Sequence, residues 1–150
     1  TDENGTEISA HEIWTLFQNT YVDVKNRHYQ TKHYQLSDIN GTQIIELDIE
    51  IDGEVQRLRG EGNGPISAML DALQLPIDVV NYEERSIGSG ANAKALALIE
   101  LQVKGTGKNA FGAGVHDNIV TSSIDAIIAC TNRLIEQGVL TTEQVAAAAV

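Results

Sequence analysis

The chain has 150 residues, enough for one ordinary domain with its own hydrophobic core. Apolar residues make up 42% and charged residues 21%, a composition typical of a soluble globular protein. The formal net charge is -11, and a negative field of this size repels phosphate backbones and acidic lipid surfaces. We therefore expect no nucleic-acid and no membrane partner. The single cysteine excludes an internal disulfide framework, so we expect a cytoplasmic protein.

A helix is predicted at about residues 9–22. Ser9 and Glu12 form a capping box, and apolar residues then recur at helical spacing, at Ile13, Leu16, Phe17 and Tyr21. The basic stretch from Lys25 to Lys32 is interpreted as a connecting segment. Because the chain starts with polar residues and without a methionine, we expect a piece of a longer protein that begins inside a linker.

Three strands and a helix are predicted over residues 34–75. The first strand opens at Tyr34, and Asn40-Gly41 is a strong signal for a type I′ hairpin turn. Residues 45–52 alternate between aliphatic and acidic side chains, as in an antiparallel strand with one buried face. Asp52-Gly53 predicts a second hairpin. The glycine-rich segment 60–64 then leads into a helix with Pro65 at its first position.

This pattern repeats. Sliding the sequence by 54 positions superposes Ile45-Glu46-Leu47 on Ile99-Glu100-Leu101 and Gly60 on Gly114, and it also brings the two helices into step. The second copy, residues 78–138, is expected to hold strands at 79–85, 95–103 and 109–113 and a helix from about Ile119 to Glu136. The predicted fold class is α+β, with two pseudo-twofold-related βββα units whose antiparallel sheets are covered by helices. Residues 139–150 are left as a C-terminal tail with room for a short helix.

The middle strand of the second copy differs from that of the first. Leu96 and Leu98 stand at outward positions where the first copy has acidic residues, so both faces of this strand are apolar. One small domain is not expected to cover both faces, and we therefore predict a homodimer.

No catalytic set is found. The 4 histidines form no two-histidine metal motif, and no nucleophile elbow or phosphate-binding loop occurs. The acidic strand side chains Glu46, Asp48 and Glu50 are better read as a solvated face than as a metal site. The glycine segments before the two helices point instead to helix N-termini that could hold a carboxylate. The alternative is that these glycines only make tight turns.

Three motifs in this order resemble one known family. The first is Gly60-Glu61-Gly62-Asn63-Gly64-Pro65-Ile66, and the second is Tyr82-x-Glu84-x-Ser86-x-x-x-Gly90-x-x-Ala93-x-Ala95. The third is Gly112-x-Gly114, followed by Asn118-Ile119 and the helix to Asn132-Arg133. Together they cover about residues 34–133 and are similar to the C-terminal regulatory domain of 2-isopropylmalate synthase.

The resemblance implies that the parent chain is an acyltransferase of leucine biosynthesis. Such an enzyme condenses acetyl-CoA with 2-oxoisovalerate in a catalytic barrel that needs a divalent metal. The present chain would lack that barrel, so we expect it to be inactive alone and to need no cofactor. By the same resemblance, residues 1–33 are the end of a linker subdomain, and residues 34–138 are a regulatory domain that binds L-leucine at a dimer interface and feedback-inhibits the barrel.

The motifs also imply which residues bind leucine: Gly62, Asn63, Ile66, Ser67, Val79, Tyr82, Ser86, Ala93 and Ile119. The family often has His where Arg85 stands and Ala where Ser67 and Ser86 stand. Two alternatives stay open. Citramalate synthases share this domain but sense isoleucine, and a pocket separates such similar side chains only by about 1 to 3 kcal/mol. The domain could also be a plain dimerisation module without a ligand.

Overall fold

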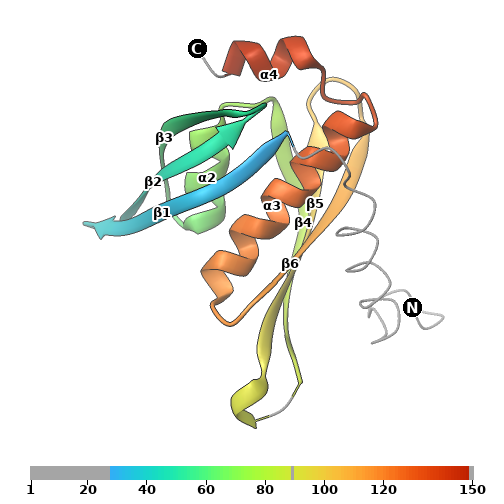
Figure 1. Ribbon diagram of the computed structural model, residues 1–150. Helices are drawn as coiled ribbons and strands as arrows, with labels where there is room; N and C mark the ends of the chain where they lie inside the picture. The colour runs from blue at the N-terminus through green and yellow to red at the C-terminus, as the bar shows by residue number, and fades with distance from the viewer. Residues whose placement is uncertain (1–27, 89, 149–150) are drawn as a thin grey trace, which may run out of the picture.

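The computed structural model describes residues 28–88 and 90–148, and the helix expected at residues 9–22 lies outside them. The described part of the chain forms two three-stranded antiparallel sheets, ordered β1-β2-β3 and β4-β5-β6 (Figure 1). The first unit contains β1 (Tyr29–Ile39), β2 (Thr42–Ile51), β3 (Glu54–Gly62) and α2 (Pro65–Leu73). The second contains β4 (Ile77–Ile87), the 3-10 helix η1 (Gly90–Asn92), β5 (Lys94–Val103), β6 (Asn109–His116) and α3 (Ile119–Glu136), and α4 (Thr142–Ala148) follows. The predicted α+β class with two βββα units is confirmed.

The first strand begins at Tyr29 and not at Tyr34, so part of the predicted connecting segment belongs to the sheet. The pairing of β1 with β2 shifts between Thr31 and His33, where a bulge interrupts the alternation of the strand. A bulge adds an unpaired residue and so breaks the period of two that a sequence pattern can detect. An equivalent bulge lies between Val79 and Asn81 in β4, which is also longer than predicted.

The repeat is real, but its two copies do not align without gaps. Gly60 pairs with Ile45 in the first sheet, whereas Gly114 pairs with Ala97 in the second. Ala97 is therefore the structural counterpart of Ile45, and the ungapped superposition of Ile45 on Ile99 was wrong. The reason is the longer turn of the second unit, in which residues 104–108 join β5 to β6 and only Asp52-Gly53 joins β2 to β3.

One hydrophobic core is shared by the two units. Helix α2 packs on β2 and β3, α3 packs on β5 and β6, and the two helices contact each other. Alternate aliphatic side chains of β2 and β5 lie in this core, and Ile45, Leu47, Ile99 and Leu101 are at most 1% exposed. The one-sided burial of β2 confirms the alternation of residues 45–52. The pairing of sheet with helix places the starts of α2 and α3 next to the ends of β3 and β6.

Leu96 and Leu98 do not form an exposed face. They are 0% and 5% exposed and form a smaller cluster with Ala113, flanked by Ile87 and Val115. The expectation that a single copy of the domain leaves one face of this strand uncovered is therefore wrong. Large apolar side chains are exposed elsewhere, at Ile39, Val55, Val79, Val80 and Phe111.

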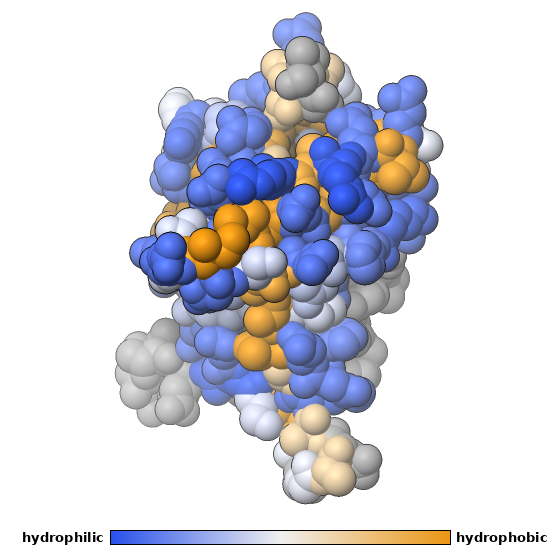
Figure 2. Space-filling view, turned by 90° about the vertical axis from the view of Figure 1, so that its left-hand side faces the viewer, coloured by the Kyte–Doolittle hydropathy of each residue, from blue (hydrophilic) through white to orange (hydrophobic). Residues whose placement is uncertain are grey.

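Figure 2 shows one side of the molecule, on which apolar side chains form a band between hydrophilic ones. In the described part of the chain, no helix is both long enough and apolar enough to cross a membrane.

Candidate functional site

Four of the glycines before the helices lie within strands and not in turns. Gly60 and Gly62 belong to β3, and Gly112 and Gly114 belong to β6. A Cβ atom on Gly60 would lie 2.1 Å from the carbonyl oxygen of Ala68, and one on Gly114 would lie 2.1 Å from that of Ser122. These glycines therefore let each helix backbone pack directly on its strand. Gly62 has the same role, because its Cβ would lie 2.5 Å from the Cβ of Ser67.

The two helix starts are capped differently. At α3, Asn118 is the N-cap, and its Oδ1 accepts hydrogen bonds from the backbone N–H groups of Val120 (2.8 Å) and Thr121 (3.1 Å). At α2 the N-cap is Gly64, which has no side chain to cap the first turn. A nearby hydrogen bond joins Ser67 Oγ to Asn63 Oδ1 at 3.0 Å. The positive end of the α3 dipole is thus already satisfied by a side chain, whereas α2 presents backbone amides.

An open cleft of about 360 Å³ lies where the end of β4, the start of β5 and the start of α3 meet. Its lining residues are Glu84, Arg85, Ser86, Ala93, Lys94, Ala95, Asp117 and Ile119. Two of these side chains are basic, two are acidic, and three are apolar. The cleft therefore offers partners for both charges of a zwitterion and a small apolar surface beside them.

An ion pair joins two elements at this cleft. Lys94 Nζ lies 2.7 Å from Asp117 Oδ1, connecting the start of β5 with the residue before the α3 cap. The hydrogen bond from Lys94, together with its charge, lowers the pKa of the Asp117 carboxyl group. Both side chains are more than half exposed, so this pair contributes little to stability but sets the charge pattern of the cleft.

The nine residues implied by the resemblance fall into three groups. Ser86, Ala93 and Ile119 line the cleft. Gly62, Asn63, Ile66 and Ser67 gather at the start of α2. Val79 and Tyr82 lie on β4, where Val79 pairs with Leu101 and Tyr82 with Ile99. The structure thus brings three of the nine into one cleft within a single chain.

Tyr82 is half-buried and its hydroxyl lies 2.6 Å from Ser123 Oγ of α3. Ser123 Oγ donates its own proton to the carbonyl oxygen of Ile119 at 2.9 Å, so Tyr82 is the donor to Ser123. Burial raises the pKa of the Tyr82 phenol. Tyr82 therefore fixes the first turns of α3 relative to β4, next to the cleft.

Sequence reasoning missed five of the cleft residues as ligand-binding candidates: Glu84, Arg85, Lys94, Ala95 and Asp117. Glu84 and Ala95 stand in the motif that carried the resemblance, but only Tyr82, Ser86 and Ala93 of that motif were assigned to the site. Lys94 and Asp117 carry no motif, since their proximity depends on how α3 returns onto β5.

The described residues contain no group of three or more His, Cys, Asp or Glu side chains that could hold a metal ion. Burial raises the pKa of the Cys130 thiol to about 12, and its Sγ donates to the carbonyl oxygen of Ala110 at 3.1 Å. A thiol in this state is a packing residue and not a nucleophile.

Comparison with known proteins identifies the family of this chain. Residues 7–135 match the model of the LeuA allosteric (dimerisation) domain. The chain is 44% identical over 137 residues to a 2-isopropylmalate synthase of Azoarcus sp., covering 91% of this chain and 24% of that protein. It is 39% identical over 133 residues to a 2-isopropylmalate synthase of Paraburkholderia phytofirmans, covering 89% of this chain and 23% of that protein. The chain spans about a quarter of the length of these relatives. It belongs to the LeuA allosteric (dimerisation) domain family.

Proposed function

We propose that this chain is the leucine-binding regulatory domain of a 2-isopropylmalate synthase, and that leucine bound here inhibits condensation of acetyl-CoA with 2-oxoisovalerate. The proposal is supported by the names of the relatives and by the allosteric description of the family. In this proposal the catalytic part belongs to the rest of the longer chain, and the regulatory domain performs no chemistry itself.

The cleft at the start of α3 is the observation that carries the leucine proposal. Free leucine has a carboxylate, an ammonium group and a branched apolar side chain. Arg85 and Lys94 match the first, Glu84 and Asp117 match the second, and Ala93, Ala95 and Ile119 provide apolar surface for the third. A nucleotide or a sugar phosphate would fit this balance of charges less well, because it brings only negative charge.

We place the ligand where two copies of the chain meet. The family description joins allostery with dimerisation, which supports a site that depends on both copies. The start of α2, with Gly62, Asn63, Ile66 and Ser67, is the second group that would contact leucine. Its uncapped first turn suits a carboxylate, because backbone N–H groups there lack a side-chain acceptor.

Calorimetric titration of the chain with leucine, isoleucine and valine tests this proposal. Leucine should bind most tightly, and Ile119→Ala should weaken it by removing apolar surface from the cleft. Ile39→Ala is the matched control, since Ile39 is an aliphatic side chain that is 56% exposed and lies outside the cleft. Tighter binding of isoleucine would favour the citramalate-synthase alternative.

A plain dimerisation module is the second candidate function. It is favoured by the close helix packing at Gly60, Gly62, Gly112 and Gly114, which explains these glycines without a ligand. In that case light scattering would show a dimer, while none of the three amino acids would release heat or raise the melting temperature.

A further inference from the structure

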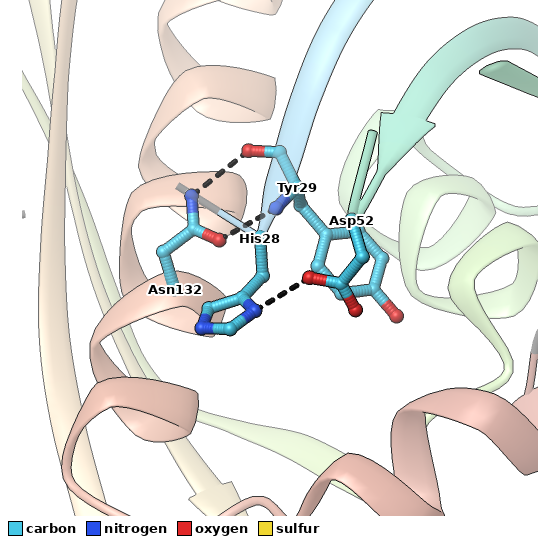
Figure 3. Close-up of polar contacts among 4 residues, drawn as sticks. All are labelled: His28, Tyr29, Asp52 and Asn132. Atoms are coloured by element: carbon cyan, nitrogen blue, oxygen red, sulfur yellow. Dashed lines mark hydrogen bonds and ion pairs between the residues drawn. The ribbon is translucent and has the colours of Figure 1, made fainter. Parts of the chain in front are cut away.

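The side chain of Asn132 holds the first strand of the other unit by its backbone. Asn132 Nδ2 donates to the carbonyl oxygen of Tyr29 at 2.9 Å, and Asn132 Oδ1 accepts from the N–H of Tyr29 at 2.8 Å (Figure 3). Asn132 is 2% exposed and Tyr29 is 1% exposed. The side-chain amide thus pairs with the backbone of Tyr29 as a neighbouring strand would, at the edge of the sheet where β1 lies. Water cannot replace either bond without opening the core.

The same two-residue segment is held from a second side. His28 Nδ1 lies 2.6 Å from Asp52 Oδ1, and the N–H of Asp52 donates to the carbonyl oxygen of His28 at 2.8 Å. Figure 3 shows the Asn132 side chain on one side of this segment and Asp52 on the other. Residues 28 and 29 are therefore fixed both to α3 and to the turn between β2 and β3. We call this set of contacts the Tyr29 clamp: His28, Tyr29, Asp52 and Asn132.

Helix α3 joins the Tyr29 clamp to the cleft. Its first residue, Ile119, lines the cleft, and Asn132 lies further along the same helix. At 1.5 Å per residue, the two positions are about 20 Å apart along the helix axis. Since a helix is stiff over this length, a displacement of its start moves Asn132 as well.

We propose that Asn132 is a positioning residue through which α3 passes the state of the ligand site to the chain that precedes residue 28. The inference rests on the proposed function. When leucine changes the position of α3, the two hydrogen bonds of Asn132 carry Tyr29 with the helix. His28 moves with Tyr29, and the displacement is passed on to the chain that is covalently attached before His28. The coupling therefore depends on the Tyr29 clamp, whereas ligand affinity depends on the cleft.

The test compares Asn132→Ala with Thr131→Val in the full-length synthase that contains this chain. Thr131 is the matched control because it is 0% exposed, adjacent in sequence, and bonded through Oγ1 only to Ile127 of its own helix in the described structure. The leucine dissociation constant is measured by calorimetry, and turnover is measured with and without saturating leucine.

We expect Asn132→Ala to keep the leucine dissociation constant within about threefold while losing most of the inhibition, since allosteric couplings are typically about 5- to 150-fold. Thr131→Val should keep both. Full inhibition in Asn132→Ala, or a loss of leucine binding in this variant alone, would overturn the inference. An unsubstituted synthase that does not bind leucine would remove the proposed function and this inference with it.

A second variant covers the case in which Asn132→Ala does not fold. Asp52→Asn removes the carboxylate that bonds to His28 but suits the turn, because Asp52 has φ 49° and asparagine tolerates this region. This variant should weaken inhibition partly and leave leucine binding unchanged. Inhibition equal to that of the unsubstituted enzyme would count against the Tyr29 clamp as the coupling point.

Discussion

Tyr34 and Tyr82 hold equivalent positions in the two sheets, yet both of their hydroxyl groups bond to helix α3. Tyr34 pairs with Leu47 in the first sheet, and Tyr82 pairs with Ile99 in the second. Tyr34 Oη lies 2.6 Å from Thr121 Oγ1, and Tyr82 Oη lies 2.6 Å from Ser123 Oγ. The pseudo-twofold symmetry is broken here, because both partner residues, Thr121 and Ser123, belong to the same helix. Helix α3 thus connects both sheets beside the cleft.

The bond between Tyr34 and Thr121 should be measurable in a double-mutant cycle. We expect Tyr34→Phe and Thr121→Val each to lower the free energy of unfolding by about 0.5 to 1.5 kcal/mol, the net value of a typical hydrogen bond. The double variant should cost less than the sum, since the second substitution removes a group that has already lost its partner. Urea unfolding gives these energies, and strictly additive effects would show that the hydroxyl groups do not interact.

Alanine at Gly60 should destabilise the fold, whereas alanine at Gly64 should not. A Cβ on Gly60 would overlap the backbone of α2 at Ala68 and Ala72, but one on Gly64 meets nothing within 4 Å. Overpacking of this kind costs about 1 to 3 kcal/mol. Thermal unfolding of the two variants checks the difference. Equal melting temperatures would contradict the packing role of Gly60.

Stability should fall at high pH through the phenol of Tyr29. Burial raises its pKa to about 12, and the charge of Asp52 adds to the effect. Between about pH 10 and 12 the unfolded chain releases this proton while the folded chain keeps it, so the contribution is present below pH 10 and lost above it.

Tyr29→Phe removes this titration and keeps the buried ring. The free energy of unfolding of the unsubstituted chain should drop more steeply between pH 10 and 11 than that of Tyr29→Phe, as measured in urea. The comparison is needed because the buried Cys130 thiol, with its pKa raised to about 12, contributes a loss of the same sign. Parallel pH profiles for the two proteins would show that Tyr29 does not titrate in this way.

The chain alone should show no synthase activity. Incubated with acetyl-CoA, 2-oxoisovalerate and a divalent metal, it should release no free CoA thiol, because in the proposed function the catalytic residues belong to another part of the protein. A thiol-reactive dye reports the release. Turnover that persists in a pure sample would contradict the regulatory role.

The sequence determined the local elements of this fold. Asn40-Gly41 and Asp52-Gly53 form the predicted hairpin turns, with φ values of 54°, 85°, 49° and 90°. Backbone preferences act within a few residues, so these signals survive in any context. The alternation along β2 and the bounds of α3 were readable for the same reason. The family was also readable, because its motifs are short segments in a fixed order.

The tertiary structure decided what lies far apart in sequence. It joined Asn132 to Tyr29, placed Lys94 beside Asp117, and showed that glycines expected in turns are strand positions covered by helices. Bulges concealed the start of β1, and burial of Leu96 and Leu98 within one chain was not evident from their alternation. Each of these outcomes depends on how elements pack against one another, and a periodic pattern shows which face is apolar but not what covers it.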